Sequence, residues 1–295
     1  MKTVAHRSFK EILPFFLPAA LLAAAWIGTN LAFPRLAPTG IPNEVARFAI
    51  NLVILAGLWG GLGRTDFGRR AKQIVWLAVA ILLTLWTALV QHLAIAGVFG
   101  PVPNPVHALP ALPLAIFLPL LVLLPLLLRS RGVGAILDAM PPSWLIGLQL
   151  YRVLGSTFLV NWIHGAIPGA FAWPAGIGDM LVGLLALPVA MRVGSLTSAD
   201  RRAGISWNLL GLTDLAVAIT MGLLTSPGPL QVLAIHRAVS QIGVYPSVMI
   251  PALAVPTSII LHVLSLRQLL RAKTTVIAMN ERKDRQLMCP FAAVA

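Results

Sequence analysis

The sequence has 295 residues, of which 58% are hydrophobic and 11% are charged, and it carries a net charge of +13. A soluble domain usually has about 25% charged residues, and the core of a water-soluble protein of this length is too small to hide so much apolar surface, so the composition excludes a soluble globular protein and predicts an integral membrane protein. The basic excess does not indicate a nucleic-acid partner, because the lysines and arginines form short clusters between apolar runs, as membrane topology signals do.

Eight apolar segments are long enough to cross a bilayer, which takes about 20 residues for roughly 30 Å of hydrocarbon. Each is predicted to be an α-helix, because lipid offers no partner to an open backbone group. The segments cover about residues 12–33, 45–62, 74–99, 109–128, 143–165, 174–192, 205–225 and 247–266. The predicted fold is an all-α, polytopic transmembrane helical bundle, with residues 1–270 as one membrane domain and residues 271–295 as a basic, partly disordered cytoplasmic tail.

Three stretches along the chain have further features of their own. The first segment is too long for the apolar part of a cleaved signal peptide, roughly 7–15 residues, and is predicted to be a retained span. The fourth contains Pro113, Pro119 and Pro125, which predict a bent helix. Between spans, residues 132–142 are predicted to form a short cytoplasmic helical turn, and residues 226–246 either lie in the membrane interface or re-enter the membrane.

The basic residues predict an orientation for these spans. Eighteen lysines and arginines fall on one side of the eight spans, whereas the other side has three, namely Arg35, Arg47 and Arg237. Cytoplasmic loops are enriched in Lys and Arg. Both termini are therefore predicted to be cytoplasmic.

Polar residues concentrate in the second half of the chain, where Arg152 and Asp214 lie inside apolar spans. A charge at the bilayer centre costs at least about 2.5–3.5 kcal/mol on insertion scales, so it is expected to be paired or to line a wet cavity. Each of the two lies about nine residues into its span from the cytoplasmic side, at a rise of about 1.5 Å per residue. We expect an ion pair between them, with Asn208 as another intramembrane polar candidate on the span of Asp214.

A second group of polar residues is predicted nearer the outer face. Asn161 and His164 fall near the outer end of the fifth span and Asp179 near that of the sixth, joined by a Gly- and Pro-rich stretch. Such a backbone often lines a cavity, so the three side chains are expected to share an outward-facing pocket. The alternative is a tight turn in which Asp179 caps the following helix.

No cofactor and no metal site are predicted. The single cysteine, Cys289, supports neither an internal disulfide nor a cysteine-based metal site. His92 and His262 are poorly matched in predicted depth for one haem, and no Glu-x-x-His or His-x-x-x-His spacing appears.

Several short runs in the second half carry a resemblance. They are Tyr151-Arg152-Val-Leu-Gly-Ser-Thr-Phe158, Gly176-Ile-Gly-Asp179 and Trp207-Asn208-Leu-Leu-Gly211-Leu-Thr-Asp214, of which the last two share a G-x-x-D pattern on consecutive spans. This half resembles multi-pass bacterial inner-membrane proteins that carry no assigned activity. The resemblance implies a bacterial inner-membrane location, with lipid as the surrounding partner, and no mechanism.

The sequence leaves three functions open. The first is a small-molecule or proton-linked transporter, or an auxiliary subunit of one, since a polar half lies beside an apolar half. The second is a membrane enzyme acting on a lipid or isoprenoid, and the third is a scaffold without a site. A transporter is expected to have a polar cavity near mid-membrane, an enzyme a polar cluster near the headgroups, and a scaffold polar groups that satisfy one another. The oligomeric state is left open as well.

Overall fold

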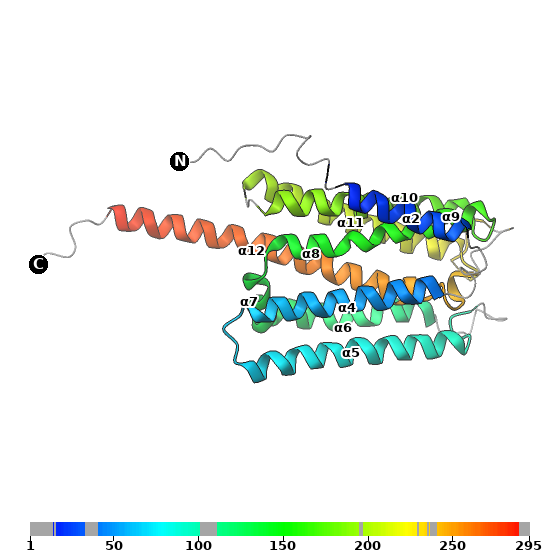
Figure 1. Cartoon of the computed structure of the whole chain (residues 1–295), viewed down its shortest axis with the longest axis horizontal. Helices are drawn as coiled ribbons and strands as arrows, with labels where there is room; N and C mark the ends of the chain where they lie inside the picture. The colour runs from blue at the N-terminus through cyan, green and yellow to red at the C-terminus, as the bar shows by residue number, and fades with distance from the viewer. Residues whose placement is uncertain are drawn as a thin grey trace, which may run out of the picture.

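The long apolar runs of the sequence form helices that lie side by side along one common direction (Figure 1). The computed structural model describes residues 14, 16–32, 41–100, 111–194, 197–228, 230–234, 236 and 241–288. Within these ranges there is no β-strand, so the predicted all-α fold class is confirmed. Cys289, Arg35 and Arg237 lie outside the described residues.

The first half of the chain forms α2 (Leu17–Ala32), α4 (Ile41–Gly63), α5 (Arg69–Ile95), α6 (Ala111–Arg129) and α7 (Arg131–Ala139). Helix α6 runs through Pro119 and Pro125 without interruption. The short helix predicted near residues 132–142 is α7, which begins after Ser130 because the Ser130 hydroxyl accepts a hydrogen bond from the Val133 backbone N–H at 3.2 Å.

The second half contains the fifth predicted span as three short pieces, α8 (Pro142–Leu148), the 3-10 helix η2 (Gln149–Ser156) and α9 (Thr157–Ile163). Then follow α10 (Gly169–Val193), α11 (Ser198–Thr225), the 3-10 turn η3 (Gln241–Gly243), the π-helical turn η4 (Ile250–Ala254) and α12 (Val255–Met288). Helix α12 thus continues well past residue 266, where the last span was predicted to end.

Six helical segments among the described residues are long and apolar enough to cross a membrane. They are Glu44–Gly63, Arg69–Ile95, Ala111–Arg129, Gly169–Val193, Ser198–Thr225 and Ile250–Arg271. Large apolar side chains cover their outer faces; Leu121, for example, is 73% exposed. Water solvates such a surface poorly and lipid solvates it well, so the protein is embedded in a membrane.

Helix α10 occupies the centre of the second half of the chain and packs against α8, η2 and α11. A cluster of buried apolar side chains joins α8, α10, α11 and α12, with Ile146, Val182 and Leu269 among its members. At Gly183 the α10 backbone approaches η2 so closely that a Cβ atom there would lie 2.6 Å from the backbone nitrogen of Val153. Small residues therefore permit the tight contact between α10 and the broken helix.

Several connections between helices that carry basic residues lie at one end of the molecule. The α4–α5 connection, the start of α7, the α10–α11 connection and the C-terminal end of α12 all lie at the left in Figure 1. At this end Arg267 of α12 donates to the backbone oxygens of Leu127 and Ser130, at 2.7 and 3.0 Å. The bond to Leu127 satisfies a carbonyl that the end of α6 leaves without a helical partner, and the bond to Ser130 ties α12 to the start of α7.

Candidate functional site

Arg152 in η2 is the centre of a buried charged cluster, and it is 3% exposed. Its Nε and Nη2 atoms both donate to Oδ1 of Asp179 on α10, at 2.8 and 2.5 Å. The Nη2 atom also donates to Oδ2 of Asp214 on α11, and Nη1 donates to the Gly211 backbone oxygen at 3.3 Å. One guanidinium therefore bridges two carboxylates from neighbouring helices.

The two carboxylates lie at about the same depth. Asp179 is ten residues after the start of α10 at Gly169, and Asp214 is eleven residues before the end of α11 at Thr225. Since α10 and α11 are antiparallel, both lie about 15–17 Å from that end of the helices, at a rise of about 1.5 Å per residue. This depth is about half of a hydrocarbon layer of roughly 30 Å.

A buried histidine supports the guanidinium from α12. Nε2 of His262 lies 3.1 Å from Nη1 of Arg152, and its Nδ1 lies 2.9 Å from Oδ1 of Asn208. The Asn208 amide nitrogen donates to Ser265 Oγ and to the Gly204 oxygen, at 3.0 and 2.8 Å. Its oxygen therefore faces the histidine and accepts the Nδ1 proton, which assigns Nε2 as the acceptor for Arg152 and leaves His262 neutral.

The 3-10 conformation of η2 explains why one short segment reaches several helices. Side chains three residues apart are aligned in a 3-10 helix, so Gln149, Arg152 and Gly155 form one row. Gln149 donates to the Ser258 backbone oxygen at 3.0 Å, Arg152 enters the cluster, and Gly155 lies against Asp179. Tyr151 and Leu154 form a second row, which faces a cavity.

Glycines make room for the charged groups. A Cβ atom at Gly155 would collide with Asp179, one at Gly178 with Asp214, and one at Gly211 with His262. Gly211 also opens the G-x-x-D run that ends at Asp214. The backbone at these positions must be bare for the cluster to form.

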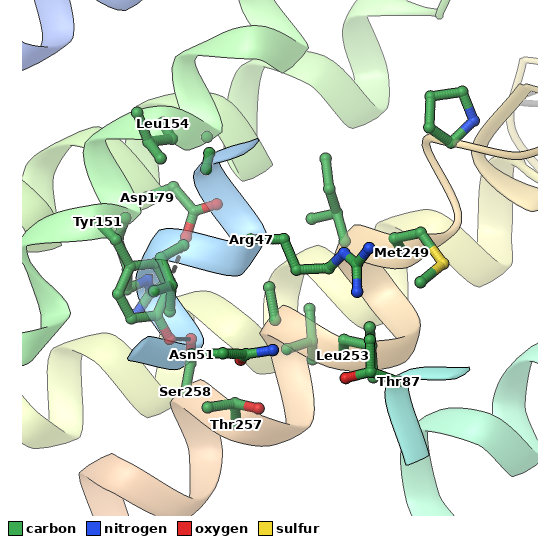
Figure 2. A pocket seen from close by; sticks show the side chains of 18 of the residues that line it. Arg47, Asn51, Thr87, Tyr151, Leu154, Asp179, Met249, Leu253, Thr257 and Ser258 are labelled. Carbon is green, nitrogen blue, oxygen red and sulfur yellow. Dashed lines mark hydrogen bonds and ion pairs between the residues drawn. The ribbon is translucent and has the colours of Figure 1, made fainter. Parts of the chain in front are cut away.

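Next to the cluster lies a cavity with a volume of about 110 Å³, lined by residues of α2, α4, α5, η2, α10, α11, η4 and the start of α12. Figure 2 shows Tyr151 and Asp179 on one side of it and Arg47, Thr87 and Met249 on the other. The Asp179 side chain is 19% exposed, and its Oδ2 atom has no hydrogen-bond partner among the described residues. A carboxylate oxygen is therefore available from the cavity.

The opposite side of the cavity carries hydrogen-bond donors. Arg47 of α4 pairs with Glu44, and its Nη2 donates to Gln91 Oε1 at 3.5 Å. Its Nε atom and Thr87 Oγ1 are buried without a hydrogen-bond partner in the described part of the chain, and both residues line the cavity. Such groups are costly unless something in the cavity satisfies them.

The structure brings together four of the six candidate residues from the sequence. The expected ion pair between Arg152 and Asp214 is present, Asp179 is its third member, and Asn208 joins through His262. The expected pocket of Asn161, His164 and Asp179 is wrong. Asp179 bonds to Arg152, whereas Asn161 and the exposed His164 do not line the cavity.

The error in that pocket comes from the start of α10. The helix begins at Gly169 and includes Pro174, not at residue 174 as predicted, because Pro168 in an extended conformation precedes it. The additional residues place Asp179 nearly three turns into the helix. The alternative, in which Asp179 caps the helix, is wrong for the same reason.

Three residues of the site were not among the candidates from the sequence. His262 was predicted too near the cytoplasmic end, because the last span was ended at residue 266. Arg47 was counted as a loop charge, although it lies inside α4. Tyr151, whose hydroxyl lies 2.6 Å from Ser258 Oγ, adjoins Arg152 in the sequence, and that adjacency was the available signal.

The described residues contain no group of three or more His, Cys, Asp or Glu side chains arranged to hold a metal ion. A family model described as "Domain of unknown function (DUF8737)" matches residues 109–270. This range includes the whole charged cluster, from η2 to α12, and leaves out the α2, α4 and α5 side of the cavity. Neither curated proteins nor solved structures gave a match.

Proposed function

We propose that this chain, which belongs to the DUF8737 family, is a proton-linked transporter of small molecules in the bacterial inner membrane. The observation that carries the proposal is the position of Asp179. It belongs to a cluster of one guanidinium and two carboxylates, halfway along the membrane-crossing helices, and one of its oxygens is available from a cavity. Ionisable groups in such a place are typical of proton and substrate pathways.

The proposal includes eight membrane crossings with both termini in the cytoplasm. Consecutive segments alternate in direction, if α8, η2 and α9 are taken as one crossing and η4 with α12 as another, and this alternation supports the count. The basic connections at one end support the orientation, because cytoplasmic loops are enriched in Lys and Arg.

The same observations disfavour the two alternatives. An enzyme acting on lipid would have its polar groups near the headgroups, whereas this cluster lies about 15 Å from the helix ends. A scaffold would have polar groups that satisfy one another, whereas Arg47 Nε and Thr87 Oγ1, which belong to residues of the cavity lining, are buried without partners among the described residues.

The test is proton movement in proteoliposomes. The purified protein is reconstituted with a pH-sensitive dye inside, a pH gradient is imposed, and panels of small organic cations, anions, zwitterions and neutral solutes are added in turn. We expect at least one class to speed the decay of the gradient with the parent protein and to have no effect with Asp179→Asn.

The matched control for this experiment is Asp138→Asn. Asp138 is a half-exposed carboxylate that pairs with Arg271 at the basic end and does not line the cavity. That variant should behave like the parent. If folded, reconstituted parent protein moves no protons with any of the four solute classes, the proposed function is wrong.

A further inference from the structure

The charges around the cavity do not balance. Arg152 contributes one positive charge and Asp179 and Asp214 two negative charges, while His262 is neutral and Arg47 is compensated by Glu44. With all these carboxylates ionised, the site carries one excess negative charge. A single excess charge in a low-dielectric interior is costly, so the site needs one bound cation or one proton.

The groups around the cavity also determine where a cation would bind. Asp179 Oδ2 is the available acceptor on one side, and the Tyr151 ring lies beside it in Figure 2. An ammonium group can donate to that oxygen and gain from the face of an aromatic ring. On the other side, the unpartnered Nε–H of Arg47 and hydroxyl of Thr87 are donors that require an acceptor.

The cavity volume limits the size of the ligand. A buried water molecule needs roughly 10–15 Å³ by this measure, and the cavity offers about 110 Å³. That is room for a molecule of on the order of ten non-hydrogen atoms. Between the polar groups the lining is apolar, with Leu83, Leu215 and Leu253 among its residues, which suits a short hydrocarbon spacer.

From these observations we propose that the cavity binds a small organic monocation, with an ammonium group at Asp179 and a neutral hydrogen-bond acceptor toward Arg47 and Thr87, and that it exchanges this cation for a proton. This inference rests on the transport function proposed above and names its substrate class. A zwitterion would leave the excess negative charge in place and an anion would add a second one, whereas a monocation neutralises it.

The proton and the ammonium ion exchange because both bind to the same carboxylate, that of Asp179. In the empty site a proton is bound to Asp179 Oδ2, while the guanidinium of Arg152 donates to Asp179 Oδ1 and to Asp214. When the ammonium ion enters, the O–H bond of Asp179 breaks, the proton leaves to water, and the ammonium N–H donates to the carboxylate oxygen. The charge of the site is the same before and after, so proton and cation exclude each other.

Other ionisable groups near this carboxylate come from several helices. Arg152 and Tyr151 face it from η2 and Asp214 from α11, while His262 of α12 acts on it through Arg152, and Arg47 with Glu44 lies across the cavity on α4. Among these, Asp214 and His262 do not line the cavity. Asp179 is the carboxylate that the cavity reaches, so we assign the exchange to it.

The probe is a homologous series of ω-amino alcohols with about two to six methylene groups, a range that fits the cavity. Binding to the full-length protein in detergent is measured by calorimetry, and proton release is measured in weak buffer. We expect the release of about one proton per bound amino alcohol, with an affinity maximum at one chain length. Diols of equal length, which lack the ammonium, and ω-amino acids, which are zwitterions, should bind at least about tenfold more weakly.

Two variants test the two ends of the ligand separately. Asp179→Asn should abolish both binding and proton release, while the exposed Asp138→Asn should leave both unchanged. Thr87→Val keeps the shape of the side chain and removes the hydroxyl, so it should reduce the preference for amino alcohols over alkylammonium ions of equal length by about tenfold. Its control is Thr220→Val, on the exposed side of α11.

The inference is overturned if amino alcohols bind no better than the diols or the amino acids, or if Asp179→Asn binds them as well as the parent. If Asp179→Asn does not fold, the comparison of Thr87→Val with the parent still tests the inference, and an unchanged preference for amino alcohols over alkylammonium ions would overturn it. Failure here is distinct from failure of the proposed function. If anions or neutral solutes drive proton movement, the proposed transport function stands and the proposed substrate class is wrong. If amines bind but no proton movement occurs in proteoliposomes, the proposed transport function is wrong.

Discussion

At the residue scale, the shared guanidinium of Arg152 makes the members of the charged cluster unequal. Removal of one aspartate leaves Arg152 paired with the other, whereas removal of Arg152 leaves two carboxylates without a cation. Breaking a buried pair by removing one partner typically costs about 3–5 kcal/mol, because an uncompensated charge remains in the interior. The three residues should therefore respond differently to neutral substitution.

We predict that Arg152→Gln is the most harmful single change, with a loss of about 3–5 kcal/mol of stability, and that Asp214→Asn costs clearly less. The double variant Arg152→Gln/Asp214→Asn should not recover fully at a pH that removes the proton from Asp179, since that carboxylate is then charged and unpaired. The triple variant that also carries Asp179→Asn should recover folding, because no buried charge is left. Thermal unfolding in detergent ranks the stabilities of these variants.

The matched control for this series is Arg70→Gln, which neutralises an exposed arginine near the start of α5. It should unfold like the parent. Recovery in the double variant equal to that in the triple variant at every pH would contradict the bridging role of Arg152, since a simple Arg152–Asp214 pair would behave in that way.

At the element scale, the site depends on the short 3-10 helix η2, which packs against α10 at Gly183. The close approach at Gly183 involves the backbone of η2, which cannot move aside as a flexible side chain can. Overpacking of a well-packed interface typically costs about 1–3 kcal/mol. The α10–η2 contact is thus predicted to tolerate no added methyl group.

We predict that Gly183→Ala destabilises the protein by about 1–3 kcal/mol and lowers cavity ligand binding, because η2 carries Arg152 and Tyr151. The matched control is Gly28→Ala in α2, where a Cβ atom would meet nothing within 4 Å. That change should be neutral or slightly stabilising, as alanine favours a helix over glycine. Melting temperatures in detergent compare the two; equal melting would refute the tight contact.

The elements also show how far the sequence could predict this structure. Long apolar runs predicted the positions of most helices, because the length and hydropathy of a run are enough to identify a membrane-crossing helix. The predicted span 205–225, for example, lies within α11, Ser198–Thr225. Depth counting also found the Arg152–Asp214 pair. The break of the fifth span into α8, η2 and α9 was missed, because a 3-10 helix differs from an α-helix in its hydrogen-bond pattern, and hydropathy carries no signal of that difference.

The side chains that complete the site were less predictable for a related reason. Asp179 was placed near a membrane surface because a shift of five residues in a helix start changes depth by about 7 Å. His262 was displaced similarly by an early end of the last span. Whether a polar residue points into the cluster depends on how its helix is rotated about its own axis. Apolar residues lie all around α10 and α11, so the sequence does not show which face of either helix points inward.

At the scale of the whole molecule, the basic residues concentrate where several connections meet at one end of the bundle. We predict that reporter fusions after Arg131 and after Lys273 report the cytoplasm and that a fusion near Gly228 reports the outside. A periplasmic signal from either of the first two fusions would overturn the eight-crossing topology.

The single excess negative charge of the Arg152 cluster has an electrical consequence. If a monocation and a proton neutralise it in turn, each cycle moves one positive charge in each direction and no net charge across the membrane. A membrane potential does work of about 2.3 kcal/mol per charge per 100 mV, but only on net charge. Exchange in proteoliposomes should therefore be driven by the pH gradient and keep the same rate when a potassium gradient with valinomycin clamps the voltage at zero or at either sign. A rate that follows the clamped voltage would show that the site carries a different charge through the cycle.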